Sequence, residues 1–238
     1  MNKQYSLQGT KIIMRRLFKY DTEEIIKCFE AYNQLFFSPV TPDFINSVLL
    51  EGEFWGAFVN NDIVACSYIY PFDCALSQKT ERYSQLTDFI SSPSEYMMLG
   101  YTGFHKINTE QNFPLDDITS VCSNIYKAFM NTAEMQAFRH GKKSVLHCMP
   151  HKLLPVLSPV FECGYELLKL RGLEKLVVHY IFVKTVYPVC STPSQQKGES
   201  CCVAQSNTKA LSRFLEDGYR AYDTFKDNNN TVLLLKHQ

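Results

Sequence analysis

The segment HCMPH places three side chains that could do chemistry close together: His147, Cys148 and His151. Imidazole and thiolate groups bind zinc, and a cysteine beside a histidine can act as a nucleophile. However, the apolar run 144–149 predicts a strand, and neighbours in a strand point to opposite faces. No fourth ligand is near in sequence, and an apolar strand would raise the pKa of the thiol. We therefore expect no metal here and favour a packing role for Cys148 over nucleophilic catalysis.

A second candidate group lies on the segment EYMMLGYTGFHK, where a predicted strand over residues 95–104 carries Glu95 and Tyr101 and leads into His105 and Lys106. Carboxylate, phenol and imidazole groups can all donate or accept protons in catalysis. The alternative interpretation is a tyrosine packed in the core and a solvated histidine.

Several elements are needed to position these groups. A polar turn at 60–62 between apolar arms predicts a hairpin. Thr41 followed by Pro42 predicts the start of a helix, and Gly141 predicts the end of a long one. The other expected elements are a strand at 11–18, a helix from 21, a helix at 114–139, a strand at 143–150, two strands within 165–186 and a hairpin around 228–230.

Composition excludes several classes of protein. The 238 residues include 24 basic and 24 acidic side chains, so no net field gathers nucleic acid. No apolar run reaches the roughly 18–20 residues that cross a membrane, and the first residues show no apolar signal region. The nine cysteines are odd in number and form no C-x-x-C pair. We therefore expect reduced thiols, a cytoplasmic location, and neither a nucleic acid nor a membrane partner.

The order of these elements resembles the GNAT (acyl-CoA N-acyltransferase) superfamily. The resemblance rests on IIMRRLFKYDTEEI as the opening strand and helix, on FWGAFVNNDIVACSYI as the second and third strands, and on SNTKALSRFLEDGY as the closing helix. It implies an α+β fold, a GNAT-like mixed but mostly antiparallel sheet with helices on both faces. It covers nearly the whole chain, although each motif alone has low specificity.

The resemblance also implies a site. In this family acetyl-CoA, as co-substrate, lies where two central strands splay apart, its arm binds the backbone of the fourth strand, and a helix N-terminus holds the pyrophosphate. Here that implies Glu95 as the general base, Tyr101 as the second catalytic residue, and a cofactor-binding set of Leu99, Gly100, Thr102, Gly103, His105, Lys106 and Asn207.

Two features depart from the family pattern. The expected phosphate loop carries glycines, but no glycine occurs from Phe104 to His140, and Asp116 and Asp117 fall in the first helical turn, where carboxylates repel an anion. The family often has a tyrosine seven residues after the closing Asn, and this position is Phe214.

The closing outline occurs twice. Gly164-Tyr165 corresponds to Gly218-Tyr219, 54 residues later (218 minus 164). Both glycines are expected to end helices with positive φ. We expect a GNAT-like domain over 1–185, a linker at 186–200, and an appended or duplicated helix-hairpin unit at 201–238 on the same sheet. A chance similarity is the alternative.

Two functions are consistent with these features. The first is an acyltransferase, an N-acetyltransferase that moves an acetyl or other acyl group from acyl-CoA to an amine of a small molecule or peptide. The second is a degenerate GNAT-like scaffold without catalysis that acts as a binding or interaction module. The absent glycine loop and Phe214 favour the second function.

Overall fold

The computed structural model describes residues 3–7, 10–33, 40–78, 81–105, 115–150, 157–173, 177–187, 199–228 and 230–237. The strands are β1 (Lys3–Leu7), β2 (Thr10–Leu17), β3 (Glu53–Val59), β4 (Asp62–Pro71), β5 (Tyr96–Phe104), β6 (Ser144–Pro150), β7 (Glu166–Leu173), β8 (Val177–Thr185), β9 (Ser200–Ala204), β10 (Tyr219–Asp227) and β11 (Asn230–His237). The helices are α1 (Thr22–Asn33), α2 (Pro42–Glu51), α3 (Ala75–Gln78), α4 (Glu81–Thr87), α5 (Leu115–Arg139), α6 (Leu157–Glu162) and α7 (Thr208–Glu216), with short 3-10 turns η1 (Lys19–Asp21) and η2 (Pro93–Glu95).

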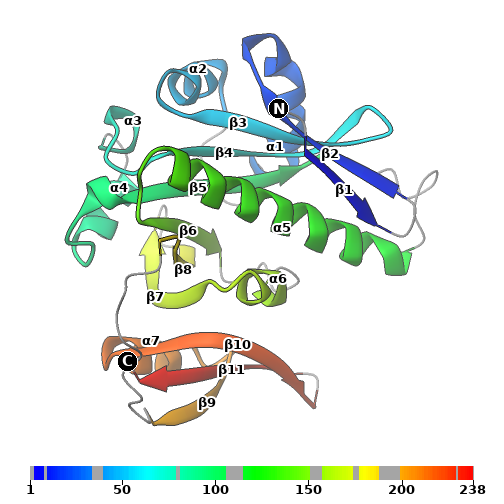
Figure 1. Ribbon diagram of the computed structural model, residues 1–238. Coiled ribbons are helices and arrows are strands. Elements are labelled where there is room, and N and C mark those ends of the chain that lie inside the picture. Colours follow the sequence, from blue (N-terminus) through cyan, green and yellow to red (C-terminus); the bar gives the residue numbers. More distant parts are fainter. Residues whose placement is uncertain are drawn as a thin grey trace.

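One sheet runs through the described residues in the order β1-β2-β3-β4-β5-β6-β8-β7-β10-β11-β9 (Figure 1). All neighbouring strands are antiparallel except β5 and β6, which are parallel. The predicted hairpin is β3–β4, and its turn residues Asn60 and Asn61 have φ values of 50° and 71°. Asparagine tolerates this left-handed region better than most residues, which explains the tight turn. Strand β4 pairs with β5 in antiparallel orientation, in keeping with the mostly antiparallel sheet that was predicted.

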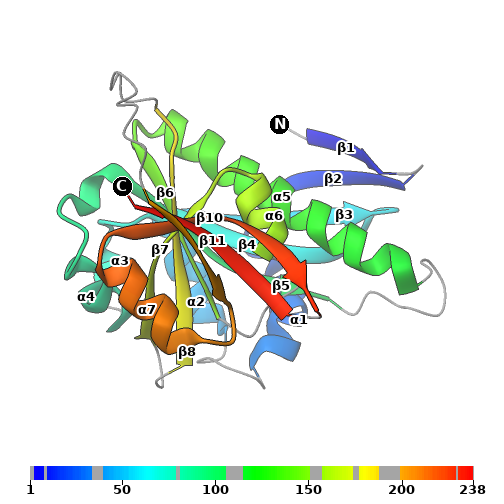
Figure 2. The same cartoon turned by 90° about the horizontal axis from the view of Figure 1, so that it is seen from below.

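The central strands are covered on both sides, as predicted (Figure 2). Helices α1, α2 and α4 pack one apolar cluster that includes Phe29, Val48 and Leu86. Helix α5 packs a second cluster on the opposite face, which includes Ile125 and Phe129. Helix α2 begins as predicted: the Phe44 amide donates to the Thr41 hydroxyl at 3.2 Å, and Pro42 occupies the first turn. No helix in the described part of the chain is long and apolar enough to cross a membrane.

The closing outline is repeated in space as well as in sequence. The elements β6-α6-β7-β8 have the strand order β6-β8-β7, and β9-α7-β10-β11 have the matching order β9-β11-β10. The prediction for the helix ends is confirmed, since φ is 78° at Gly164 and 93° at Gly218. A bulge interrupts β7 between Leu167 and Lys169, and another interrupts β10 between Ala221 and Asp223, again 54 positions apart.

The two repeated units meet through the same position of each. Leu167 of β7 pairs with Ala221 of β10, which is its counterpart in the repeat. Helix α6 packs against β10, and α7 packs against β7. A contact between equivalent positions is the isologous arrangement found across a two-fold axis. The division of the chain into a domain, a linker and an appended unit stays a prediction, and residues 188–198 of that linker lie outside the described residues.

Candidate functional site

Strands β5 and β6 run side by side for four residues and then part. Their parallel pairing starts at Tyr96 with Ser144 and ends at Leu99 with His147. Beyond this point β5 is held only by β4, and β6 only by β8, so each strand continues without the other. We call the separated segments, residues 100–104 of β5 and 148–150 of β6, the strand fork. Among the described residues no strand pairs the edge of β5 that faces the fork.

A bulge in β5 sits at the start of the strand fork. Ile69 pairs with Leu99 and Ser67 with Thr102, so Gly100 and Tyr101 together oppose a single residue of β4. Position 100 requires glycine, because a Cβ there would lie 2.2 Å from the Tyr68 ring. The Ser67 hydroxyl donates to the Tyr101 carbonyl at 3.1 Å and holds the bulge in place. Bulges re-aim side chains, and this one changes the side of the sheet on which Tyr101 packs.

Tyr101 reaches across the strand fork to β8. Its hydroxyl lies 3.0 Å from Nε2 of His179, and both side chains are buried. It packs in the apolar cluster of α1 and α2, as does Cys148 of β6. Because His179 of β8 pairs with Pro150, the last residue of β6, this hydrogen bond connects β5 to the strand on the far side of β6.

A second Tyr–His pair closes the α5 side of the strand fork. The His147 ring contacts the Leu99 carbonyl through Nδ1 at 3.1 Å and the Tyr126 hydroxyl through Nε2 at 2.7 Å. A carbonyl oxygen only accepts, so Nδ1 must carry hydrogen. In the neutral ring Nε2 is therefore the acceptor and Tyr126 the donor. The His147 side chain therefore donates to the carbonyl of Leu99, the last residue of β5 that pairs with β6.

Thr102 has a buried hydroxyl without a partner. The residue is 2% exposed, and its Oγ1 makes no hydrogen bond to any described residue. A Cβ at Gly103 would lie 2.5 Å from the Cys28 carbonyl, so position 103 faces α1. Its strand neighbour Thr102 therefore faces the α5 side. Leaving a buried polar group unpaired costs about 1–3 kcal/mol, so this hydroxyl marks a place where a ligand atom would stabilise the fold.

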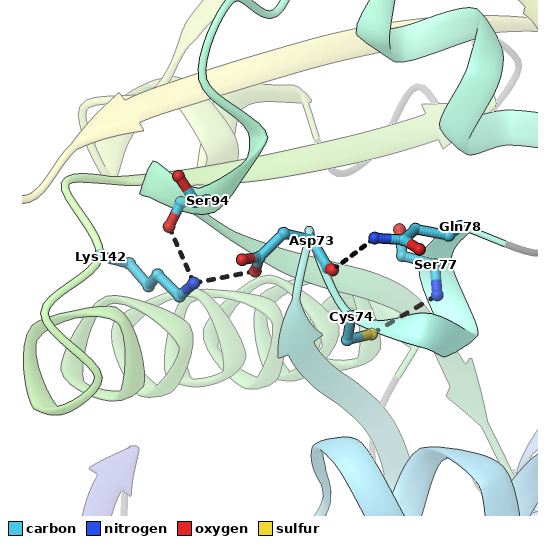
Figure 3. A network of polar contacts seen from close by, with 6 residues as sticks. All are labelled: Asp73, Cys74, Ser77, Gln78, Ser94 and Lys142. Carbon is cyan, nitrogen blue, oxygen red and sulfur yellow. Dashed lines mark hydrogen bonds and ion pairs between the residues drawn. The ribbon is translucent and has the colours of Figure 1, made fainter.

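The paired end of β5 and β6 is pinned by ionic contacts (Figure 3). Lys142 donates to Asp73 Oδ1 at 2.9 Å and to the Ser94 carbonyl at 2.8 Å. In the same network the Ser77 amide donates to the Cys74 sulfur at 3.5 Å. Burial, followed by a hydrogen bond to Glu51, raises the pKa of the Cys74 thiol to about 11, so it stays protonated near neutral pH.

Glu95 belongs to this pinned end. Its side chain forms an ion pair with Lys143, and its carbonyl accepts from the Lys143 amide at 2.8 Å. Six residues of extended chain separate it from Tyr101, a distance of roughly 20 Å. The structure therefore does not bring the two predicted catalytic residues together. The role of Glu95 as a base stays a prediction, and its contacts favour a structural role.

The predicted cofactor-binding residues divide into two groups. Gly100, Thr102 and Gly103 lie on β5 in the strand fork. Leu99 is the last paired residue before the fork, and its carbonyl is already bound by His147. His105 follows directly, and its amide donates to the Val64 carbonyl at 3.0 Å.

The remaining predicted residues are not at the strand fork. Asn207 caps α7, where its Oδ1 accepts from the Ala210 amide at 3.1 Å. Strands β8, β7, β10 and β11 lie between β6 and β9, the strand that leads to α7. Lys106 lies outside the described residues, as do the side chains of Asp116 and Asp117.

Sequence reasoning missed three residues that border the strand fork. Tyr126 and His179 are not among the residues selected from the sequence, and His147 is considered there only as a metal ligand or as the histidine partner of a Cys148 nucleophile. The one available signal is that both histidines interrupt strongly apolar strands, in SVLHCMP and VVHYIFV, where a buried polar ring requires a partner. In the described part of the chain no group of three His, Cys, Asp or Glu side chains is placed to hold a metal.

Comparisons of sequence and of structure give different results. The sequence matches no protein-family model and no curated protein. The structure is similar to the GNAT domain of S. lividans PAT, with a TM-score of 0.50 and 12% identity over 77% of this chain and 97% of that one. It is also similar to a Salmonella typhimurium protein solved with its cofactor acetyl-CoA, with a TM-score of 0.50 and 8% identity over 77% and 98% of the two chains.

A third similar structure extends further along the chain. It is an uncharacterized protein from Bacillus halodurans, with a TM-score of 0.52 and 8% identity over 91% of this chain and 96% of that one. The predicted fold is confirmed: the chain has the fold of the GNAT superfamily, in a form highly divergent in sequence.

Proposed function

We propose that this protein is an acyltransferase that moves an acyl group from the thioester of acyl-CoA to an amine of a small molecule or peptide. The observation that carries the proposal is the strand fork, where β5 and β6 part immediately after Leu99 and His147. The fold supports it, because a structurally similar protein was solved with acetyl-CoA as its cofactor.

In this proposal the pantetheine arm lies along β5. An extended arm with two amides can hydrogen-bond to a strand edge as an added strand does. The backbone of Gly100, Thr102 and Gly103 supplies that edge, and the Thr102 hydroxyl gains the partner that it lacks. In the sequence, His105 and Lys106 come directly after β5, and we assign these two residues to the phosphate end of the cofactor.

The reaction moves one proton from the attacking nitrogen to the departing sulfur. We assign this transfer to Tyr101 and His179, whose side chains are hydrogen-bonded at 3.0 Å. The imidazole accepts the proton that the amine loses as its C–N bond forms. The phenol donates its own proton to the thiolate as the C–S bond breaks, and then recovers one from the imidazolium. The pair returns to its starting state, so atoms and charge balance.

The second candidate function is a scaffold that binds without catalysis. Two observations favour it: the segment from Phe104 to His140 carries no glycine, and Val160 and Phe214 stand where the family often has a proton donor. A scaffold would use the strand fork to bind a ligand but would not need the Tyr101–His179 pair.

Calorimetric titration with acetyl-CoA, followed by a thiol-release assay with primary amines, tests both functions. We expect the wild type to bind. Thr102→Val should weaken binding about five- to tenfold because one hydrogen bond is lost. Thr224→Val is the matched control, since that hydroxyl bonds the Val232 carbonyl in the C-terminal unit.

Tyr101→Phe separates catalysis from binding. We expect unchanged acetyl-CoA affinity and turnover reduced about 10²-fold or more, as for loss of a general acid. Binding without turnover in the wild type would favour the scaffold. If acetyl-CoA binds neither the wild type nor any variant, the acyltransferase function is wrong, and so is a scaffold that binds acyl-CoA.

A further inference from the structure

A second candidate site lies near the start of β5, at the opposite end of that strand from the strand fork. A cavity of about 220 Å³ opens between the end of α2 and the last turns of α5. Leu49, Ile69 and Met97 supply part of an apolar wall, and Arg16, Gln136 and His140 are among its polar lining residues. Met97 belongs to the paired part of β5, so the cavity is distinct from the fork.

Gln136 gives this cavity its chemistry. The residue is 3% exposed, and its Nε2 has no hydrogen-bond partner. The carboxamide makes no hydrogen bond within the described part of the chain, so exchanging its oxygen and nitrogen would satisfy neither atom. A buried amide left in this state costs free energy, and native structures seldom contain one without a reason. It offers a donor and an acceptor side by side to whatever occupies the cavity.

The charged groups around the cavity already have partners. Arg16 forms an ion pair with Glu53 at 2.9 Å and lies over the Phe18 ring at 5.6 Å. Glu51 accepts from the Leu76 amide at 2.9 Å. A carboxylate ligand would lie close to the Glu51 charge, and the Arg16 guanidinium beside the cavity is already paired with Glu53. A neutral ligand avoids this repulsion and matches the paired donor and acceptor of Gln136.

The size of the cavity also limits the occupant. One water takes up about 30 Å³ of liquid, so the volume exceeds that of a single water and is small for a drug-sized ligand. A volume of about 220 Å³ suits a short branched hydrocarbon with one polar end group.

We propose that this cavity binds a small neutral ligand that carries a primary carboxamide on a short branched apolar body. The carboxamide forms two hydrogen bonds with the Gln136 amide, one in each direction. The hydrocarbon packs against Leu49, Ile69 and Met97. This site is independent of the proposed acyl transfer.

Isovaleramide is the probe for this proposal, and isovalerate is its charged isostere. We expect isovaleramide to bind the full-length protein in the millimolar range. Binding to the wild type and to each variant is followed in a nitrogen-15 NMR titration by the shifts of the backbone amide signals of Gly52, Ile69 and Met97, which line the cavity. Isovalerate should bind at least fivefold more weakly. Gln136→Met keeps the side-chain length but removes both hydrogen bonds, and should weaken isovaleramide at least tenfold.

A stability measurement guards against a folding artefact. Gln136→Met removes an unpaired buried amide, so its Tm should equal or exceed that of the wild type while ligand binding is lost. Thr132→Val is the control: Thr132 lies one turn earlier on α5, buried, with its hydroxyl on the Ala128 carbonyl at 2.7 Å. It should leave binding unchanged. Equal affinity of wild type and Gln136→Met, equal or tighter binding of isovalerate, or no binding of isovaleramide would each overturn the proposal.

Discussion

Helices α6 and α7 start from similar sequences and finish in different surroundings. LSPVFECGY and LSRFLEDGY share Leu, Ser, Glu, Gly and Tyr at matching positions. Ser158 donates to Glu162 at 2.8 Å, and its counterpart Ser212 donates to Glu216 at 3.2 Å. Each helix ends at a glycine with positive φ. Local sequence therefore determines helix, hydrogen bond and stop in the same way twice.

The difference between the units comes from α5. It packs against α6, and Val160 is fully buried there. The matching Phe214 on α7 is only half-buried and lines a cavity of about 460 Å³ together with Arg213. Tyr165 is buried, and its hydroxyl has no hydrogen-bond partner among the described residues, whereas the matching Tyr219 donates to Glu199 at 3.3 Å. The burial of each helix's outer face thus depends on whether α5 packs against that helix. The repeated sequence pattern does not determine this.

The largest expected effect on stability comes from introducing a charge on the outer face of each helix. Val160→Asp places an unpaired carboxylate under α5 and should cost about 3–5 kcal/mol of unfolding free energy. Phe214→Asp should cost only about 1 kcal/mol, the loss of its edge-to-face contact with Tyr219 at 5.2 Å. Urea unfolding followed by circular dichroism measures both.

If Val160→Asp does not fold, Val160→Thr and Phe214→Thr provide a milder comparison with the same expected order. Equal costs at the two positions would show that α5 does not distinguish the units.

An intermediate effect tests what the units share. Gly164→Ala and Gly218→Ala force a Cβ into the left-handed region, which costs about 1–2 kcal/mol each. The nearest atoms to the added Cβ are 3.8 Å and 3.4 Å away, so the cost is mainly conformational. Gly141→Ala is the matched control, with φ of 64° and no atom within 4 Å. Thermal unfolding of the three variants should show similar decreases in stability. A Gly164→Ala or Gly218→Ala variant as stable as the wild type would contradict the comparison.

The smallest effect depends on pH. A hydrogen bond from Lys127, then one from Ser158, lowers the pKa of Glu162. A lowered carboxyl pKa stabilises the fold fully above its ordinary value of about 4.3, and this contribution disappears as pH falls through the lowered pKa. Because the pair is largely exposed, it contributes only about 0.2–1 kcal/mol.

Glu162→Gln should therefore be slightly less stable than the wild type at pH 6, with the gap closing at low pH and in high salt. Glu216→Gln is the control, since Ser212 is the hydrogen-bond partner that the structure gives Glu216. A gap for Glu162→Gln that does not change with pH would mean that the ion pair does not contribute.

Much of the fold could be predicted from local signals. The β3–β4 hairpin, the Thr41 cap and the two positive-φ glycines depend on residues within a few positions of one another. The strand fork could not be predicted in the same way. Tyr101 and His179 are 78 positions apart, and Tyr126 and His147 are 21 apart, so each pairing exists only after the sheet has formed. Glu95 was singled out by family position, yet the ion pair with Lys143 depends on the start of β6.

The contact between Leu167 and Ala221 has an evolutionary consequence. When two identical subunits meet through one position, every mutation appears on both sides at once, so a large residue must face another large residue. Within a single chain each side mutates alone, and here a large side chain opposes a small one. Covalent linkage also makes the junction independent of protein concentration, because the two halves cannot separate on dilution. In a single chain the outer faces of α6 and α7 can therefore differ while the contact between Leu167 and Ala221 is kept.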